Sequence, residues 1–340
     1  MTMTAARAQQ AEQVAHIAVL LPLKAASFTR PADAVRRGIF EAQRVNPGSG
    51  LPVVVHNTSD DPYDIVQTYE RAVHDGARLI IGPLTRSAVS ALASSNLVTV
   101  PTLALNTPEA EIPLPPNLYV FGLQVEPEAR QIAQLAAEQG RRKALVVVAE
   151  TVLSHRLSQA FAEEFAQRKG SVVEQFPFTQ EPASLMKLRD SLALGTADMA
   201  FLALDGARAR AVRSYLGAVL PVYATSLVHT TPDPKTNFEL NGVIFVDMPW
   251  MLLADHPAVL SYARPETGGQ STMEFQRFYA VGIDAYRLAQ DLLKGGSDFA
   301  PLDGVTGYIT PGRDRRFTRE LIPAQFVQGE PKVLTEARSR

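Results

Sequence analysis

Polar groups gather where predicted strands end and predicted helices begin. The loops concerned are residues 21–28, 82–85, 105–107, 150–154, 205–206, 226 and 247–249. Hydroxyl and amide side chains, together with backbone amides at helix N-termini, are groups that hold a small carboxylate or another anion. Serine and threonine are also ordinary helix caps, so each of these residues has a structural alternative. The pattern therefore predicts a polar cleft and leaves the role of each residue as a hypothesis.

Motifs for catalysis and for metal binding are missing from the sequence. There is no G-x-S-x-G elbow, H-E-x-x-H helix or G-K-[ST] phosphate loop, and Leu21-Pro22-Leu23 stands where a dinucleotide-binding loop would need glycines. The six histidines include no pair four positions apart. The absence of cysteine excludes disulfides, thiolate metal sites and a thiol nucleophile. We therefore expect a protein that is not an enzyme and uses neither cofactor nor metal.

Composition narrows the range of partners. Lys and Arg number 33 against 35 Asp and Glu, and the formal net charge is −2, which argues against a nucleic-acid partner. The longest apolar run, Ile17 to Leu23, is far shorter than the roughly 20 residues that span a bilayer. The first residues are polar and rich in alanine, without the apolar core of a signal peptide, as in a processed or added N-terminus or a cytoplasmic protein.

The elements that must position the polar loops alternate regularly between strand and helix. In the first half, apolar runs predict strands at 16–23, 51–56, 79–81, 100–105 and 119–123. Helical spacing predicts helices over 31–45, after the Asp61-Pro62 cap and over 86–94. Alternation with short helices is typical of a parallel sheet with right-handed crossovers.

The second half repeats this alternation. Helices are predicted over 127–139, after Ser154, over 184–194 and over 207–216, with strands at 144–149, 171–178, 199–204 and 222–226. Val243 to Val246 reads as a crossover strand, and Thr272 to Lys294 as the longest helix. The tail from Val305 to Val333 favours strands and turns, and we expect a terminal hairpin there.

These elements predict an α/β protein with two doubly wound, Rossmann-like lobes joined by a multi-strand hinge. A chain of 340 residues favours two cores over one. We assign residues 16–123 and 247–300 to the first lobe and residues 124–246 and 301–335 to the second. Residues 1–15 are expected to be disordered or added outside the fold.

Several segments match a known family. The order HIAVLLPL, VVVHNTSDDP, DGARLIIGPLTRSAVSAL and VPTLALN resembles the type I periplasmic-binding-protein fold of leucine/isoleucine/valine-binding proteins. The more specific LNGVIFVDMPWML, FYAVGIDAYRLAQDLL and RELIPAQF resemble the C-terminal domain of the LppC family of outer-membrane lipoproteins. That resemblance implies a periplasmic location, a role in peptidoglycan synthesis and a bifunctional penicillin-binding protein as partner. The family's lipidated cysteine and helical-repeat N-terminal domain are absent here, so membrane contact is expected only through a lipid anchor outside this sequence.

The binding-protein resemblance also implies a ligand set. Its first wall would hold the carboxylate and ammonium of an amino acid, and the carboxylates of the second wall could pair with the ammonium. The residues carried over are Lys24, Ser27, Gly82, Leu84, Thr85, Asn106, Thr107, Glu150, Asp205, Ser226 and Asp247. For Asp247 and Trp250, the structural alternatives are an interlobe hydrogen bond and a core aromatic ring.

Two functions of different classes follow. One is an envelope interaction module that docks on a penicillin-binding protein, and the other is a solute receptor that closes around an amino acid or a similar molecule. The feature that distinguishes the two functions is the state of the cleft. A receptor needs unpaired polar groups that converge in the cleft, whereas an interaction module can have a cleft filled by its own side chains. Arg313, Arg315, Arg316 and Arg319 form a cationic run that we interpret as a solvated hairpin face or a docking patch for an acidic partner.

Overall fold

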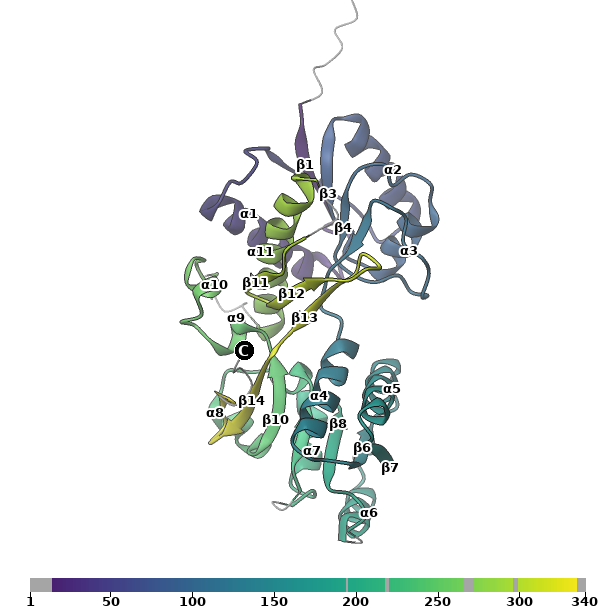
Figure 1. The fold of residues 1–340 in the computed structure, drawn as a ribbon, viewed down its shortest axis with the longest axis vertical. Helices are drawn as coiled ribbons and strands as arrows, with labels where there is room; N and C mark the ends of the chain where they lie inside the picture. Colours follow the sequence, from purple (N-terminus) through teal and green to yellow (C-terminus); the bar gives the residue numbers. More distant parts are fainter. Residues whose placement is uncertain (1–13, 194, 218–219, 266–271, 296–298, 335–340) are drawn as a thin grey trace, which may run out of the picture.

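The computed structural model describes residues 14–193, 195–217, 220–265, 272–295 and 299–334. The predicted N-terminal segment 1–15 therefore lies outside the described residues, apart from Val14 and Ala15. Two α/β bodies lie end to end along the long axis, with a small antiparallel sheet between them (Figure 1). We call them the first lobe and the second lobe in chain order.

The first lobe is built on a parallel sheet in the order β2-β1-β3-β4-β5. Its strands are β1 (His16–Leu21), β2 (Val53–Asn57), β3 (Ala77–Ile81), β4 (Thr102–Ala104) and β5 (Leu118–Val120). Every residue of β1 is buried, as its continuous apolar run predicts for a strand covered on both faces.

Helices cover both faces of this sheet. Ile17 and Val19 join the core cluster that includes α1 (Thr29–Val45) and α11 (Met273–Leu293). Ala18 and Leu20 point the other way, toward α2 (Pro62–His74) and α3 (Arg86–Ser94). The alternation follows from the two-residue period of a strand.

The second lobe has a seven-stranded sheet in the order β15-β14-β10-β9-β8-β6-β7. Its parallel strands are β6 (Lys143–Val148), β7 (Ser171–Pro177), β8 (Met199–Ala203), β9 (Val222–Ala224) and β10 (Val243–Asp247), and β14 (Ile322–Val327) and β15 (Glu330–Val333) add to it in antiparallel fashion. One face packs on α4 (Glu126–Glu138) and α5 (Val152–Gln167), and the other on α6 (Pro182–Ala193) and α7 (Gly206–Arg213). Short elements complete the lobe connections: η1 (Ser226–Val228), α8 (Pro234–Asn237), η2 (Phe238–Leu240), α9 (Pro249–Leu252) and α10 (Pro257–Leu260).

The chain crosses between the lobes more than once. It leaves β5 for α4, returns after β10 through α9 to α11, and re-enters the second lobe at β14. On the way back it forms a separate antiparallel sheet of β11 (Leu302–Gly304), β12 (Gly307–Pro311) and β13 (Phe317–Glu320). The tail is therefore not the single terminal hairpin that its composition predicts. Antiparallel pairs of consecutive strands form at β11–β12, β12–β13 and β14–β15, and only the last of these belongs to the sheet of the second lobe.

Two glycines bring α1 and α11 into close contact. A Cβ atom on Gly38 would lie 2.0 Å from the Tyr279 carbonyl oxygen, and one on Gly282 would lie 2.1 Å from the Val35 carbonyl oxygen. No other residue type fits at this crossing without moving a backbone. The parallel sheets and two lobes confirm the predicted α/β fold class, while the exact division into lobes stays a prediction.

Candidate functional site

Five residues of the predicted first wall lie together at the ends of β3 and β4. Gly82 precedes a cis peptide bond to Pro83, with φ at 111°, and a Cβ there would lie 2.2 Å from the Leu20 carbonyl oxygen. The Asn106 side-chain amide donates to the Leu84 carbonyl oxygen at 3.1 Å, and the Asn106 side-chain oxygen accepts from the Thr107 amide at 3.0 Å. Thr85 caps α3 by accepting from the Ala88 amide. The turn is thus held by its own polar groups.

The other two residues of the first wall lie after β1. The Lys24 amide donates to the Thr58 carbonyl oxygen at 3.0 Å, which fixes the loop, while the Lys24 side chain is exposed. Ser27 is also exposed. Both lie at the same sheet edge as the Gly82 turn because β1 and β3 are parallel neighbours.

Two carboxylates of the second wall are engaged by residues close to them in the chain. Asp205 caps α7 through the Arg208 amide at 2.9 Å and also pairs with the Arg208 guanidinium. Glu150 has an 81% exposed side chain and lies 3.8 Å from His155 Nε2. Neither carboxylate is buried and unpaired, which is the state that would favour capture of an ammonium group.

Ser226 and Asp247 are brought together in the interior. Asp247 is 0% exposed and its Oδ2 atom lies 2.6 Å from Arg277 Nη2 and 2.9 Å from His229 Nδ1. The Met248 amide donates to the other oxygen at 2.9 Å. Arg277 also donates to the carbonyl oxygens of Ser226 and His229. Asp247 therefore forms internal bonds, in line with its structural alternative, and lies away from solvent.

Further charged groups extend this cluster toward α4 and β13. Glu128, on the first turn of α4, is 5% exposed and accepts from the Ser226 amide at 3.0 Å. Arg319 on β13 donates to the Thr306 carbonyl oxygen at 3.2 Å. The hinge network, as we call it, consists of Glu128, Ser226, His229, Asp247, Arg277 and Arg319. It joins segments from the second lobe to α11, which packs on the first.

Burial sets the titration of the network. Burial raises the pKa of Glu128 to about 7, although the nearby Arg319 charge opposes the shift. Burial also lowers the pKa of Arg319. Burial would raise the pKa of Asp247, but the charge of Arg277 and the hydrogen bond to His229 outweigh it and hold that pKa below its ordinary value. The hinge network thus contains one carboxylate whose pKa is held low by its partners and one whose pKa is raised to about 7 by burial.

Sequence reasoning did not place Glu128, Arg277 or Arg319 in this network, and it interpreted Arg319 as part of a solvated hairpin face or a docking patch. A usable signal exists for two of them, because each lies within an apolar helical stripe. Glu128 aligns with Ile132 and Ala136 at four-residue spacing, and Arg277 aligns with Val281. A charge inside such a stripe indicates a buried partner. Arg319 gives no comparable signal.

The cationic run at 313–319 does not form one solvated face. Arg319 is turned inward, whereas Arg315 and Arg316 donate to the carbonyl oxygens of Leu114 and Ile112. Arg313 is exposed. Trp250 is a core aromatic residue, as its structural alternative predicts, with Nε1 donating to Gln276 at 2.8 Å.

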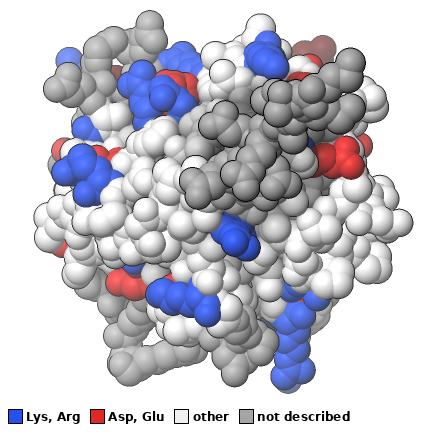
Figure 2. Space-filling model, turned by 90° about the horizontal axis from the view of Figure 1, so that it is seen from above, with Lys and Arg blue, Asp and Glu red and all other residues white. Residues whose placement is uncertain are grey.

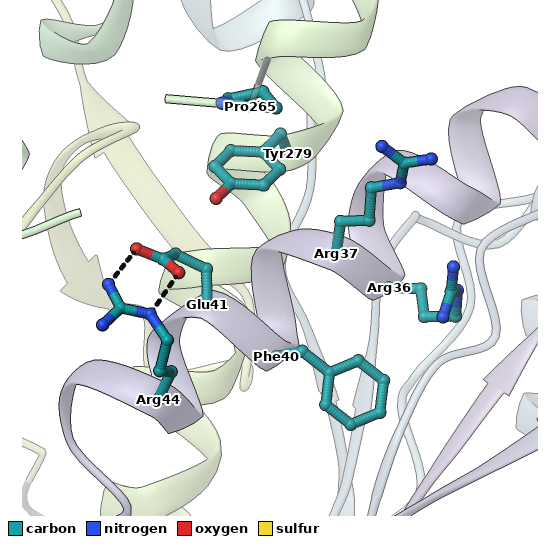
Figure 3. Close-up of a pocket in the computed structure, with 7 residues that line it drawn as sticks. All are labelled: Arg36, Arg37, Phe40, Glu41, Arg44, Pro265 and Tyr279. Carbon is teal, nitrogen blue, oxygen red and sulfur yellow. Dashed lines mark hydrogen bonds and ion pairs between the residues drawn. The ribbon is translucent and has the colours of Figure 1, made fainter. Parts of the chain in front are cut away.

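A pocket of about 380 Å³ lies away from these groups, on α1 and α11. It is lined by Arg36, Arg37, Phe40, Glu41, Arg44, Pro265 and Tyr279 (Figure 3). Glu41 and Arg44 face each other with two hydrogen bonds of 2.8 Å. Arg36 and Arg37 pair with Asp33. Its charged groups are therefore all paired with other residues of α1, so the pocket offers little for a ligand.

The described residues include no helix long and apolar enough to cross a membrane, and no group of three or more potential metal-ligating side chains. Seen from above, the described basic and acidic side chains are scattered among uncharged ones, without a continuous cationic stripe on that face (Figure 2).

The family model and the curated relatives point to the same protein family. A family model described as "LppC putative lipoprotein" matches residues 2–214 and 195–329. The "Penicillin-binding protein activator LpoA" of Pectobacterium parmentieri is 28% identical over 363 residues, which cover 90% of this chain and 51% of that protein. The activator of the same name from Pantoea ananatis is 28% identical, with 83% and 48% covered. The chain spans about half the length of these curated relatives.

Solved structures agree on the fold. A Chromobacterium violaceum protein titled "putative branched-chain amino acid ABC transporter" is 40% identical with a TM-score of 0.77, covering 92% of this chain and all of that one. The LpoA C-domain from Haemophilus influenzae is 21% identical with a TM-score of 0.80, covering 94% of this chain and all of that one.

Proposed function

We propose, from the premise that this chain belongs to the LppC family, that it is a non-enzymatic envelope protein that binds a bifunctional penicillin-binding protein and raises its activity. The relatives that share its sequence are named as activators of penicillin-binding proteins. The proposal includes a periplasmic location of the protein, with attachment to the outer membrane through a lipid anchor.

The observation that carries the proposal is the state of the second-wall carboxylates. An amino-acid receptor of this design needs a buried acidic group that is left unpaired to meet the ammonium of its ligand. Asp247 is buried against Arg277, Asp205 is paired with Arg208, and the Glu150 side chain is directed to solvent. This arrangement supports a two-lobed body that presents an outer surface to a partner rather than one that closes on a solute.

The test is a reconstitution with a purified bifunctional penicillin-binding protein. Glycan-strand synthesis and cross-linking from the lipid-linked precursor would be measured with and without this chain, together with binding by biolayer interferometry. We expect saturable binding. We also expect the rate of glycan synthesis or cross-linking to rise with the concentration of this chain over the same range as binding does. The Glu150→Ala variant, which removes an exposed candidate ligand group, should stimulate equally. Absence of both binding and stimulation would refute the proposal.

The second candidate is a solute receptor, and one observation favours it. The match at 40% identity, over the full length of the other chain, is to a protein titled as an amino-acid transporter component. Under this alternative, leucine, isoleucine or valine at about a hundred times its dissociation constant would stabilise the folded chain by roughly 2.7 kcal/mol. A thermal-shift series with these amino acids decides between the two, because the activator proposal expects no shift.

A further inference from the structure

A second pocket lies between the edge strand β5 and the turn that joins β12 to β13. Its volume is about 250 Å³, and it is lined by Pro116, Tyr119, Phe299, Pro311, Gly312, Arg313, Arg315 and Phe317. Tyr119, Phe299 and Phe317 surround it with ring centroids 5.7 to 6.3 Å apart, and Phe299 lies edge-on to Tyr119. Three aromatic rings and two proline rings make an apolar wall that is open to solvent.

The walls of this pocket are held by the backbone. Tyr119 belongs to β5, and the next residue, Val120, donates its amide to the Arg315 carbonyl oxygen at 2.9 Å. Phe317 pairs with Pro311 across β12 and β13. Within the turn, the Gly312 amide donates to the Arg316 carbonyl oxygen at 2.9 Å. The rings are thus positioned before any ligand arrives, which lowers the entropic cost of binding.

The rim of the pocket carries an available positive charge. Arg315 and Arg316 donate to the Leu114 and Ile112 carbonyl oxygens, and Asp314 pairs with Arg316 at 3.1 Å. Arg313 is exposed and forms no hydrogen bond or ion pair with the described part of the chain. An arginine free at the edge of an apolar pocket favours a ligand in which a carboxylate neighbours an apolar group.

We propose that this pocket binds an extended acidic peptide segment of a partner protein. A phenylalanine or proline side chain of that segment packs in the pocket against the rings of Tyr119, Phe299 and Phe317, and the carboxylate next to it pairs with Arg313. The volume is below the roughly 300–1,000 Å³ of pockets for whole small molecules, and it suits a side chain with its flanking backbone. Aromatic-lined grooves of this kind hold extended proline-containing segments. A neutral sugar chain would stack on the rings but leave Arg313 without a partner.

The test is isothermal titration calorimetry of the full chain with an unlabelled nine-residue peptide. Its central proline-phenylalanine-glutamate-proline sequence is flanked by serines, and matched peptides replace the glutamate by glutamine or the phenylalanine by alanine. We expect sub-millimolar binding of the first peptide and about tenfold or greater weakening for each matched peptide. The Arg313→Glu variant should weaken binding of the first peptide by a similar factor.

The control variant is Arg130→Glu, which makes the same charge change at an exposed position of α4 that does not line the pocket. It should bind the peptide as the wild type does. Equal losses in Arg130→Glu and Arg313→Glu would overturn the proposal, since general charge would then explain them. So would no heat at millimolar peptide, equal binding of the glutamine peptide, or preference for a neutral chito-oligosaccharide. Phe299→Ala tests the apolar wall and should also weaken peptide binding. If Phe299→Ala does not fold, the result for Arg313→Glu decides the test.

Discussion

Arg277 Nη2 lies 2.6 Å from Asp247 Oδ2, although the two residues are 30 positions apart, and this contact ties α11 to the end of β10. Asp247 is fully buried and Arg277 is 14% exposed at its side chain. Both side chains of a buried ion pair lose their hydration when the protein folds. Removing one partner therefore leaves the other as a buried charge without compensation. The hinge is therefore expected to be sensitive to any change that removes one partner alone.

Arg277→Met should lower the free energy of unfolding by about 3–5 kcal/mol, because Asp247 would stay buried with only His229 and a backbone amide beside it. Guanidinium denaturation measures the change. Lys294→Met is the matched control, since it breaks the pair with Asp291 at 2.7 Å on the surface, where the loss should be about 0–1 kcal/mol. Similar losses in both variants would contradict the role given to the buried pair.

Glu128 should make stability depend on pH. Its pKa is about 7 in the folded chain against 4.5 ordinarily, so the folded state binds more protons between these values. Its contribution is fully present below pH about 4.5 and is lost as pH rises through about 7, an effect of about 3 kcal/mol. Unfolding titrations of wild type and Glu128→Gln across this range should show the difference, because glutamine does not titrate. A constant difference between the two proteins would refute the raised pKa.

Gly282→Ala should destabilise the first lobe. The added Cβ would lie 2.1 Å from the Val35 carbonyl oxygen, so α1 and α11 must separate at a cost of about 1–3 kcal/mol or more. In an open helix the same change would stabilise by up to about 1 kcal/mol, so the sign of the effect is diagnostic. Thermal unfolding gives that sign, and an unchanged or higher midpoint would contradict the close crossing.

Asp205→Ala should act on stability alone. It removes the cap of α7, which is worth about 0.5–2 kcal/mol, without touching a surface assigned to the partner. Stimulation of the penicillin-binding protein should be unchanged once the variant is folded. Glu150→Ala, at an exposed position, should change neither property. A loss of amino-acid binding in Asp205→Ala would instead support the receptor alternative.

Much of the fold was predictable because its signals are local. Continuous apolar runs such as Ile17 to Leu21 indicated strands buried on both faces, and Asp61-Pro62 indicated a helix start that α2 confirms. The predicted helix at 272–294 differs from α11 by one residue at each end. The tail was predicted less well, since pairing among β11, β12 and β13 depends on partners that strand propensity does not specify.

The sequence by itself determined the alternation of strands and helices, the helix caps and the absence of cysteine chemistry, because each depends on residue type or on spacing within a few positions. Only the tertiary structure decided that Asp247 meets Arg277, that Arg319 turns inward while Arg313 stays exposed, and that Tyr119, Phe299 and Phe317 close a pocket. These contacts join segments separated by tens to hundreds of residues. They arise because the chain crosses repeatedly between the lobes. The spacing of residues within one helix or strand does not predict which distant side chains these crossings bring together.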